Sequence, residues 1–352
     1  MTPRVSRENL GSMWRSVLRA VLTGFGLVLI VYCSPSPTHA ASGTWTRQRP
    51  GSLAWLHSLF FLDQNRGWAA GSRGTLLLTT DGGATWRAKS QPTVDAIRDI
   101  HFIDKYNGFL VCERNIYDLK SNEEPRAYLM KTSDGGEQWN RVNLRGANAD
   151  VRLMRAIFNN TGHGWAFGEG GALYTTEDAG DTWNRLQAPT RYLLLGGTFI
   201  DQNNGWLVGA GSTILRTSDG GQTWNHSRLP NTSSLRFNST SFVNERLGWA
   251  VGSGGVIYRT VNGGRSWQAQ NSGVTADLLD VKFLDAVEGW AVGTEGTVVH
   301  TNNGGLRWTA ERSGTPHTLE RIFFTDRTHG WAVGFGGTII KYGTADAPRL
   351  RR

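Results

Sequence analysis

The sequence predicts an all-β fold, a seven-bladed β-propeller, from two regularly spaced aromatic series and a glycine-rich composition. In the first series a Gly-Trp pair recurs every 41 to 43 residues apart from one interval of 56, and Phe109 fills the slot without tryptophan. The 352-residue chain contains 45 Gly and 15 Trp, which favours short strands and tight turns over helices. The first series is Trp68, Trp165, Trp206, Trp249, Trp290 and Trp331; the second is Trp86, Trp139, Trp183, Trp224, Trp267 and Trp308.

Each repeat follows one pattern, which is clearest in the sixth. Residues 281–284 predict a first strand, residues 289–293 a second and residues 296–301 a third. A turn at 302–305 then leads to a fourth strand that holds Trp308. Four strands in a unit of about 40 residues are typical of a propeller blade. Helical periodicity is not seen beyond the first 40 residues.

The seventh repeat lacks its fourth strand, and the N-terminus is predicted to supply it. The pattern stops after a third strand at 338–342. Trp45 precedes Trp86 by 41 residues, which is one full period. We therefore expect residues 44–46 to complete blade seven. Closing the ring in this way removes the open sheet edges that promote aggregation.

The two ends of the chain are assigned to other roles. Residues 1–40 predict a secretory signal peptide, because arginines precede an apolar stretch of 12 residues that is too short to span a bilayer. Cleavage is expected after Ala40; the alternatives are a lipoprotein signal at Cys33 and an uncleaved anchor. The propeller is assigned to residues 41–344 and a disordered basic tail to residues 345–352.

Charge and cysteine content narrow the expected partners. Cleavage would remove four arginines and one glutamate, so the formal net charge would fall from +8 to +5. A basic mature chain favours acidic partners. Cys112 would be its single cysteine, so no internal disulfide is expected.

A turn motif, TSDGGQTW at residues 217–224, recurs in six repeats. Its Asp or Asn oxygen is expected to accept hydrogen bonds from the following backbone, and its glycines to adopt positive φ. Asn replaces Asp in two copies and cannot transfer a proton, so a structural role is favoured over catalysis; weak calcium binding is the remaining alternative. The positions are Asp81, Trp86, Asp134, Trp139, Asp178, Trp183, Asp219, Trp224, Asn262, Trp267, Asn303 and Trp308.

This motif is the Asp-box, or BNR repeat, which also occurs in sialidases and xyloglucanases. The longer pattern, Phe-x-Asp followed by GWAVG and TxDGGxxW, resembles the photosystem II assembly and stability factors of cyanobacteria and chloroplasts and their bacterial relatives. The resemblance covers residues 44–343, and residues 235–242 are similar to a segment of those factors. It implies a non-enzymatic monomer, in the periplasm or thylakoid lumen, that binds a membrane-protein assembly intermediate. In a photosynthetic host that partner would be a photosystem II reaction-centre subunit, and peripheral membrane association is compatible with this role.

The alternative is a carbohydrate-active propeller, either a glycoside hydrolase or a glycan binder. Sialidases carry an Arg-Ile-Pro motif that is absent from this sequence. A hydrolase of the xyloglucanase type needs two facing carboxylates, and no pair stands out by context. The histidines lack zinc-ligand spacing. We therefore predict no enzyme activity, no cofactor and no metal; dispersed basic residues also argue against nucleic acid.

Partner binding is predicted at the end of the ring where the first strands begin. The interval of 56 residues places an insertion at residues 112–127, between the second and third strands of blade two. Six arginines at or near the first strands are expected to form a basic collar around the channel mouth. Asp99, Asp277, Asp280 and Glu320 are interleaved with them, so a mixed surface is the equal alternative. The six are Arg98, Arg152, Arg155, Arg191, Arg236 and Arg321.

Overall fold

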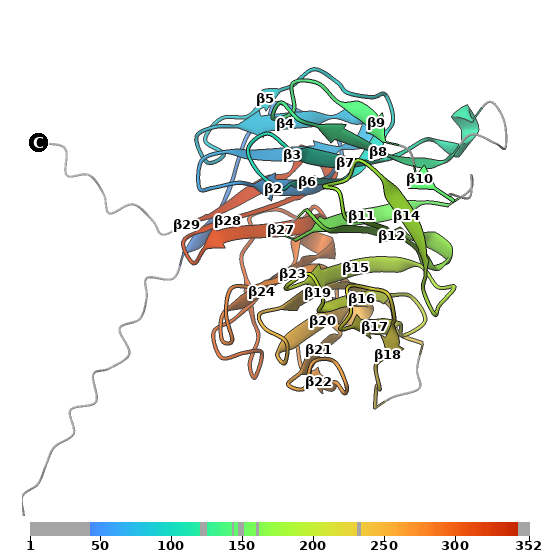
Figure 1. Ribbon diagram of the computed structural model, residues 1–352. Helices are drawn as coiled ribbons and strands as arrows, with labels where there is room; N and C mark the ends of the chain where they lie inside the picture. The colour runs from blue at the N-terminus through green and yellow to red at the C-terminus, as the bar shows by residue number, and fades with distance from the viewer. Residues whose placement is uncertain are drawn as a thin grey trace, which may run out of the picture. The chain divides into compact units, whose positions relative to one another are not determined.

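The structure, a computed structural model, describes residues 43–119, 125–142, 144–146, 151–159, 162–230 and 234–343. The described residues form seven β-sheets in chain order around a ring (Figure 1). Each innermost strand packs against the next, and the seventh packs against the first, so the predicted seven-bladed propeller is confirmed. The predicted signal peptide and basic tail lie outside the described residues. The inner strands are β2 (Leu56–Phe61), β6 (Ala96–Phe102), β11 (Leu153–Phe158), β15 (Leu194–Phe199), β19 (Phe237–Phe242), β23 (Leu278–Phe283) and β27 (Leu319–Asp326).

The remaining strands run outward from these in antiparallel order. Blades one to three add β3 (Gly67–Gly71), β4 (Leu76–Thr79) and β5 (Arg87–Ala88); β7 (Gly108–Glu113), β8 (Ala127–Thr132) and β9 (Asn140–Val142); and β12 (Gly164–Gly168), β13 (Ala172–Thr176) and β14 (Trp183–Gln187). Blades four to six add β16 (Gly205–Gly209), β17 (Ile214–Thr217) and β18 (Asn225–His226); β20 (Gly248–Gly252), β21 (Ile257–Thr260) and β22 (Gln268–Gln270); and β24 (Gly289–Gly293), β25 (Val298–Thr301) and β26 (Thr309–Glu311). Blade seven adds β28 (His329–Gly334), β29 (Ile339–Gly343) and β1 (Thr44–Arg47).

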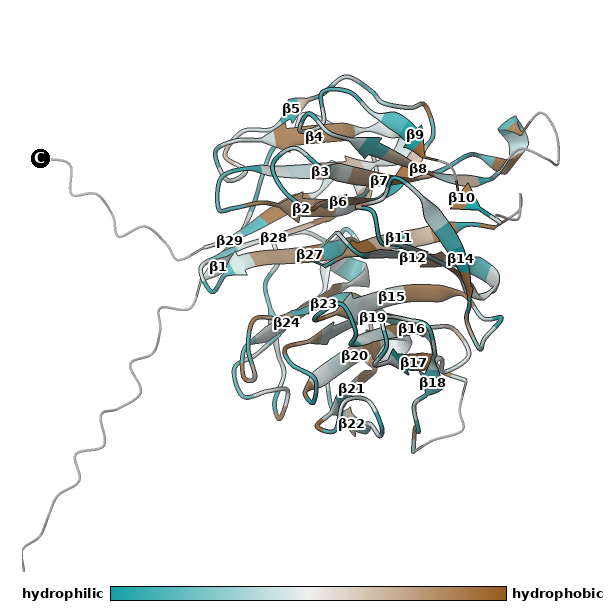
Figure 2. Cartoon of the chain, viewed as in Figure 1, coloured by the Kyte–Doolittle hydropathy of each residue, from teal (hydrophilic) through white to brown (hydrophobic). Residues whose placement is uncertain are grey.

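Two details differ from the predicted repeat pattern. Blade three has a fifth strand, because β10 (Leu144–Arg145) pairs with β14 in parallel at the outer edge. The fourth strand of blade six begins at Thr309, so Trp308 lies just before it. Figure 2 shows apolar residues on inner strands such as β2 and β15, and hydrophilic residues on outer strands such as β9 and β14. Hydropathy therefore falls from the inner to the outer strands. The outer strands are short because they bury little apolar surface.

Ring closure occurs as predicted. Strand β1 pairs antiparallel with β29, with Trp45 opposite Tyr342. Trp45 is 8% exposed, and its indole N–H donates to Glu311 Oε2 at 2.8 Å. The N-terminal strand therefore joins blade seven and also contacts the outer strand of blade six.

Neighbouring blades are held together by one repeated aromatic contact. The aromatic residue of each second strand stacks on the phenylalanine near the end of the next inner strand, as Trp249 does on Phe283 with centroids 3.4 Å apart. The blade seven copy joins Trp331 to Phe61 at 3.6 Å and so closes the circle. The other five contacts are Trp68 with Phe102, Phe109 with Phe158, Trp165 with Phe199, Trp206 with Phe242 and Trp290 with Phe324.

The Asp-box tryptophans pack against the same phenylalanines from within their own blade. Trp308 meets Phe283 edge-on, with centroids 5.7 Å apart and rings at 87°. Trp45 meets Phe324 in the same way at 5.9 Å and 84°. Trp45 therefore occupies the Asp-box tryptophan position of the blade that has no Asp-box of its own. A face-to-face and an edge-on partner together enclose each phenylalanine, an arrangement favoured by the ring quadrupoles.

The Asp-box forms a hydrogen-bonded turn. Asp219 Oδ1 accepts from Thr217 Oγ1 at 2.7 Å and from Thr223 N at 2.9 Å. Asn262 Oδ1 makes the equivalent contacts with Thr260 Oγ1 and Ser266 N, both at 3.0 Å. The amide therefore replaces the carboxylate without changing the turn.

The turn also contacts the preceding blade, and the contact requires glycine. The Trp165 indole N–H donates to the carbonyl of Gly220 at 2.9 Å. A Cβ on Gly221, where φ is +90°, would lie 3.1 Å from that indole nitrogen. Equivalent bonds from Trp206, Trp249 and Trp331 link the turns of three other blades to the blades before them.

Replacing Trp45 with alanine tests the ring closure. We expect W45A to lower the free energy of unfolding by about 3–5 kcal/mol, because it removes a buried indole and leaves a cavity between β1 and β29. Chemical denaturation measures this change. The matched control is W55A, which removes an indole that is 40% exposed and should cost about 1 kcal/mol. Equal losses in the two variants would contradict the closing role of Trp45.

Substitutions of Asp219 test whether the Asp-box needs a hydrogen-bond acceptor or a negative charge at this position. We expect D219N to change the free energy of unfolding by less than about 1 kcal/mol, since Asn262 makes the same bonds in blade five. D219A removes the acceptor from three bonds, because Asp219 Oδ2 also accepts from Thr223 Oγ1, and should cost about 1–2 kcal/mol. Thermal denaturation of both variants provides the comparison. A D219N variant as unstable as D219A would show that the negative charge, and not the oxygen acceptor, is required.

Candidate partner-binding site

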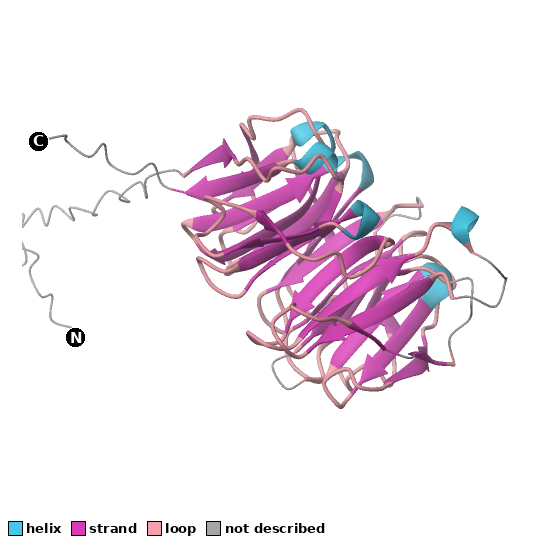
Figure 3. Cartoon of the chain, turned by 90° about the horizontal axis from the view of Figure 1, so that it is seen from above, coloured by secondary structure: helices cyan, strands magenta, loops and turns pink. Residues whose placement is uncertain are grey.

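The face on which the inner strands begin differs from the opposite face in structure and charge. The connections between second and third strands also lie there, and we call it the mouth face. Short 3-10 turns form most of these connections and lie along one side of the ring (Figure 3). The Asp-box turns lie on the opposite face because they join third to fourth strands. The mouth-face turns are η1 (Ser72–Gly74), η2 (Ile116–Asp118), η3 (Glu169–Gly171), η4 (Ser253–Gly255), η5 (Thr294–Gly296) and η6 (Phe335–Gly337).

The predicted insertion lies on this face. It begins at the end of β7 and returns at the start of β8, and residues 120–124 lie outside the described part of the chain. Asn115 accepts a hydrogen bond from Tyr117 N and so caps η2. The Tyr117 side chain is exposed. At the base of the insertion, Cys112 is fully buried, and burial raises the pKa of its thiol.

Charged residues fill the channel beneath the mouth in a pattern that occurs twice. Every inner strand has a register irregularity near its start, after the second residue in β6 and after the first residue in the others. The residue that follows it occupies the same position in each blade. Blades one to three place Ser, Asp and Arg at this position, blade four places glycine, and blades five to seven place Ser, Asp and Arg again. We call these six residues the channel brace: Ser58, Asp99, Arg155, Ser239, Asp280 and Arg321.

Each aspartate of the brace links three blades. Asp280 accepts from Ser239 Oγ of the preceding blade at 2.5 Å and from Ile322 N of the following blade at 3.1 Å. Asp99 accepts from Ser58 Oγ at 2.6 Å and from Ala156 N at 3.1 Å in the same arrangement.

One arginine of the brace reaches across the channel. The Arg155 guanidinium, in blade three, lies 3.1 Å from Asp280 Oδ1 in blade six. Burial alone would raise the pKa of Asp280, but Arg155, Arg321 and the Ser239 hydroxyl outweigh it and hold the pKa below its usual range. Burial and the neighbouring Arg155 lower the pKa of Arg321, while Asp280 and Asp99 act in the opposite direction. The brace therefore contains two cations and two anions that compensate one another.

A second set of ion pairs lies at the mouth over blades two and three. Glu113, which is buried, accepts from Arg98 Nε at 2.5 Å and from an Arg126 nitrogen at 2.9 Å. Arg152 Nε lies 3.3 Å from Glu169 Oε2. We call Arg98, Glu113, Arg126, Arg152 and Glu169 the mouth cluster; it contains three arginines and two glutamates.

The structure places the six predicted arginines in four settings. Arg98 and Arg152 belong to the mouth cluster, and Arg155 and Arg321 belong to the channel brace. Arg236 donates to Asn238 at 3.1 Å. Arg191 lines a groove between blades three and four. Of the interleaved carboxylates, Asp280 pairs directly with Arg155.

Sequence reasoning missed Glu113 and Arg126 as members of the site. Both lie inside the insertion of residues 112–127, at the last residue of β7 and just before β8. The double Ser-Asp-Arg series carried a detectable signal, because its members share one position in the repeat. That signal is visible when the blades are aligned on the Gly-Trp pair, because each member lies ten residues before the aromatic residue of the pair.

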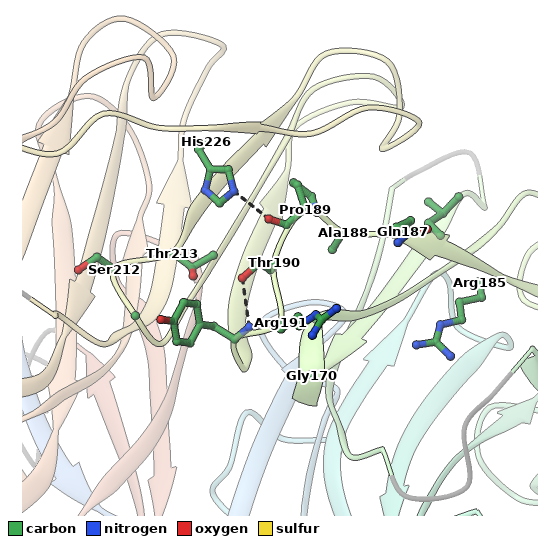
Figure 4. Close-up of a pocket in the computed structure, with 14 residues that line it drawn as sticks. Gly170, Arg185, Gln187, Ala188, Pro189, Thr190, Arg191, Ser212, Thr213 and His226 are labelled. Atoms are coloured by element: carbon green, nitrogen blue, oxygen red, sulfur yellow. Dashed lines mark hydrogen bonds between the residues drawn. The ribbon is translucent and has the colours of Figure 1, made fainter.

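The groove between blades three and four has a volume of about 870 Å³ (Figure 4). Its wall runs from the end of β14 through the connection to β15, and the turn after β16 and His226 of β18 complete it. In the view of Figure 4, Arg191 lies between His226 and Arg185. An equivalent groove of about 760 Å³ lies between blades one and two.

Among the described residues, no group of three or more His, Cys, Asp or Glu side chains has a geometry suited to a metal ion. Within the same residues, no helix has the length and apolarity needed to cross a membrane.

Comparison with known proteins identifies close and distant likenesses. Residues 90–193, 186–272 and 268–343 match the model of the family described as photosynthesis system II assembly factor YCF48. A curated relative, the chloroplastic photosystem II stability/assembly factor HCF136 of Arabidopsis thaliana, is 28% identical over 122 residues. Those residues are 34% of this chain and 28% of the relative, so the match spans under a third of that protein.

Solved structures share the fold at lower identity. The structure titled YCF48 bound to D1 peptide has a TM-score of 0.69 and 21% identity over 85% of this chain and 97% of that one. A GH74 xyloglucanase from Xanthomonas campestris has a TM-score of 0.66 and 13% identity over 88% of this chain and 55% of that one. At these identities the likeness establishes the propeller fold.

Removing the charge of Asp280 tests the channel brace. We expect D280N to lower the free energy of unfolding by about 3–5 kcal/mol, because Arg155 and Arg321 lose their shared counter-ion in a buried setting. Adding R155M should recover part of this loss, since one uncompensated charge is then removed. E295Q, at an exposed carboxylate of the same blade, is the control and should change stability by less than about 0.5 kcal/mol. If D280N unfolds like the wild-type protein in denaturant, the brace does not stabilise the ring.

Proposed function

This chain belongs to the photosystem II assembly factor family, and we propose that it is a non-enzymatic scaffold that binds a membrane-protein subunit during assembly. The observation that carries the proposal is the family match, which extends from blade two to blade seven. A closed ring whose blades are stacked on one another offers a rigid platform, and a rigid platform binds a flexible client with little entropic cost of its own.

The proposed client is a segment of a photosystem II reaction-centre subunit, in a host that contains photosystem II. A solved relative is described as bound to a D1 peptide, and this supports a peptide segment as the bound form. We propose that the chain acts as an exported monomer in the periplasm or thylakoid lumen, in peripheral association with the membrane. Its chloroplastic relative and the predicted signal peptide support that location.

The state of the channel carboxylates supports a scaffold over a glycoside hydrolase. Hydrolysis needs one carboxylic acid and one carboxylate free to approach the sugar. Asp99 and Asp280 instead accept hydrogen bonds from both neighbouring blades. In the Asp-boxes, burial would raise the pKa of Asp178, but hydrogen bonds from Thr182 and Thr176 lower it to about 2. Such a group is a poor proton donor at neutral pH.

The mouth face is the proposed client-binding surface. It carries the mouth cluster and the insertion between β7 and β8. Trp55 and Phe335 meet edge-on at this face with centroids 5.2 Å apart, and both are partly exposed. Aromatic and arginine side chains are the groups enriched at the energetic centres of protein interfaces. Their combination on one face supports recognition of a peptide that is both apolar and acidic.

Charge reversal on the two faces tests this assignment. We expect R152E/R236E to weaken binding of a synthetic D1 peptide by about tenfold or more, because the mouth face then repels an acidic client. Arg155 is left intact, since reversing it would place a third negative charge in the channel brace. Fluorescence anisotropy with the full chain measures the affinity.

The matched control is R265E/R307E, which makes the same change on the Asp-box face at two exposed arginines. It should bind the peptide as the wild-type protein does. Equal weakening by the two double variants would show a non-specific charge effect, and no binding by the wild-type protein would refute the proposed function. Co-purification with membrane-complex intermediates is the corresponding test in cells.

A further inference from the structure

The strand that closes the ring is held by a hydrogen bond to a charged group. The Trp45 indole N–H of β1 donates to Glu311 Oε2 of β26 at 2.8 Å. The equivalent residue in blade five is Gln270, which also lies three positions after the Asp-box tryptophan of its blade. Its Oε1 accepts from the Trp308 indole at 3.5 Å. The same junction of two blades thus has a carboxylate at the ring closure and a neutral amide one blade earlier.

The other tryptophans at this position show that the bond to Glu311 is unusual. Trp183 donates within its own turn, to the Gly180 carbonyl at 3.2 Å. Within the described chain, four more of these indole nitrogens are buried without a hydrogen-bond partner: those of Trp86, Trp139, Trp224 and Trp267. A hydrogen bond to a charged acceptor is about twice as strong as a neutral one. In the described part of the chain, Trp45 alone among the seven has such an acceptor, so the state of Glu311 affects the closing strand directly.

Glu311 is in turn held by His300 of β25. His300 Nδ1 lies 3.1 Å from Glu311 Oε1, and its Nε2 lies 2.9 Å from Glu288 Oε1. The imidazole ring stacks on Trp290, with centroids 4.4 Å apart and an angle of 12° between the planes. The histidine and the two glutamates are between 20% and 22% exposed. We call His300, Glu288 and Glu311 the closure cluster.

The geometry of the closure cluster requires a protonated ring. A neutral imidazole has one N–H and one lone pair, so it donates to one carboxylate and turns the lone pair toward the other. The imidazolium has two N–H groups and donates to both. Burial alone would lower the pKa of His300, but hydrogen bonds and charges from Glu311 and Glu288 outweigh it and raise the pKa.

The other titratable groups beside the cluster keep their charge state near neutral pH. Arg327 pairs with Asp285, and its Nε lies 4.0 Å from Glu288 Oε2; a guanidinium stays charged throughout this range. Burial and the nearby glutamates raise the pKa of Tyr342 of β29, so its hydroxyl keeps its proton. His300 is therefore the group of this region whose charge changes between about pH 6 and pH 8.5.

The position of His300 carries a permanent cation in most other blades. It lies opposite the aromatic residue of the second strand. The residues opposite that aromatic in blades two, four, five and seven are lysine or arginine. Arg259, for example, lies 5.9 Å from the centroid of the Trp249 ring. Histidine thus keeps the cation of the repeat but makes its charge depend on pH, in the blade that contacts the closing strand.

We propose that His300 makes closure of the ring dependent on pH. In its charged form it holds Glu311 against the Trp45 indole and fastens β1, and loss of the proton removes one of its two bonds and the charge that orients Glu311. Because the pKa of His300 in the fold lies above its ordinary value of 6.5, this stabilisation is complete below that value and is lost as pH rises through the raised pKa. The ring is therefore closed most tightly under acidic conditions. This behaviour does not depend on the proposed function, since it arises from the fold itself.

NMR spectroscopy of the full chain tests the link from His300 to the closing strand. The ring nitrogens of His300, assigned by comparison with H300Q, should titrate with a midpoint above 6.5. The indole N–H of Trp45, assigned with W45F, should shift with the same midpoint, because the ring holds its acceptor. E311Q keeps an acceptor oxygen and removes the charge, as Gln270 does in blade five, and should lower the midpoint of His300.

Hydrogen exchange of the β1 amides measures the closure itself. In the wild-type chain we expect protection of β1 to be about fivefold lower or more at pH 8.5 than at pH 6, after correction for intrinsic exchange rates. H300Q should show the lower protection at both pH values. H300R places the permanent cation of the other blades at this position and should keep the higher protection at both. The thermal unfolding temperature of each variant reports on its fold.

Two controls separate this effect from a general response of the ring to pH. His329 also pairs with a carboxylate, Asp326 at 2.9 Å, but within the described chain its side chain makes no hydrogen bond or ion pair with β1. H329Q should therefore keep the wild-type dependence on pH. Strand β22 of blade five, which carries the neutral Gln270, is an internal reference whose protection should not change with pH.

A His300 midpoint at or below 6.5 would overturn the proposal, as would equal protection of β1 at the two pH values in the wild-type chain. A dependence on pH that persists in H300Q would show that another group controls β1. Loss of the dependence in H329Q, or an equal change in β22, would reveal a general effect on the ring. Each of these results would also overturn the proposal.

Discussion

The face-to-face contact between the aromatic residue of one second strand and the phenylalanine of the next inner strand organises the whole ring. It occurs seven times in the described residues, with centroid distances from 3.4 to 4.2 Å. Contacts of this type contribute about 0.5–1.5 kcal/mol each beyond the area that they bury. Because each stack joins consecutive blades, the position of one blade determines that of the next.

Other features of the repeat follow from this stack. In four of the seven contacts of the described residues, the indole that stacks on the next blade also donates to the first Asp-box glycine of that blade, as Trp249 does to Gly304 at 3.1 Å. The close approach of the turn to the indole favours glycine at the following position, where a Cβ on Gly264 would lie 2.9 Å from the Trp206 nitrogen. The Asp or Asn of the turn then fixes the loop that carries these glycines. The Asp-box is therefore a joint between blades, which explains its presence in six of them.

The Asp-box face joins the blades to one another, so binding of a partner is assigned to the mouth face. The charges on that face are balanced to different degrees. The channel brace pairs two arginines with two aspartates, the mouth cluster pairs three arginines with two glutamates, and the groove that Arg191 lines has no carboxylate among its described residues. Buried charges must be compensated to be stable, whereas charges in an open groove need not be. The charges of the channel brace therefore serve to stabilise the ring.

Much of the fold could be predicted from the sequence, because it follows from local periodicity. The count of seven blades and the closing role of Trp45 both depend on spacing along the chain. The short strand β10 escaped prediction, since Leu144 and Arg145 carry too little pattern to indicate a strand. The partners of the arginines could not be predicted from the sequence either. Arg155 and Asp280 lie 125 residues apart, and they meet because the ring brings blades three and six together across the channel. The one-signed groove likewise depends on which side chains of two blades face each other.

The central claim is that a client lies on the mouth face. A photo-reactive amino acid placed at Tyr192, and separately at Val261, would test it most directly. Val261 is 52% exposed and belongs to the Asp-box turn of blade five, on the opposite face. Cross-linking of the proposed client peptide to the full chain, located by mass spectrometry, should occur from position 192 and not from position 261. Cross-links from position 261 at equal or greater yield would contradict the account.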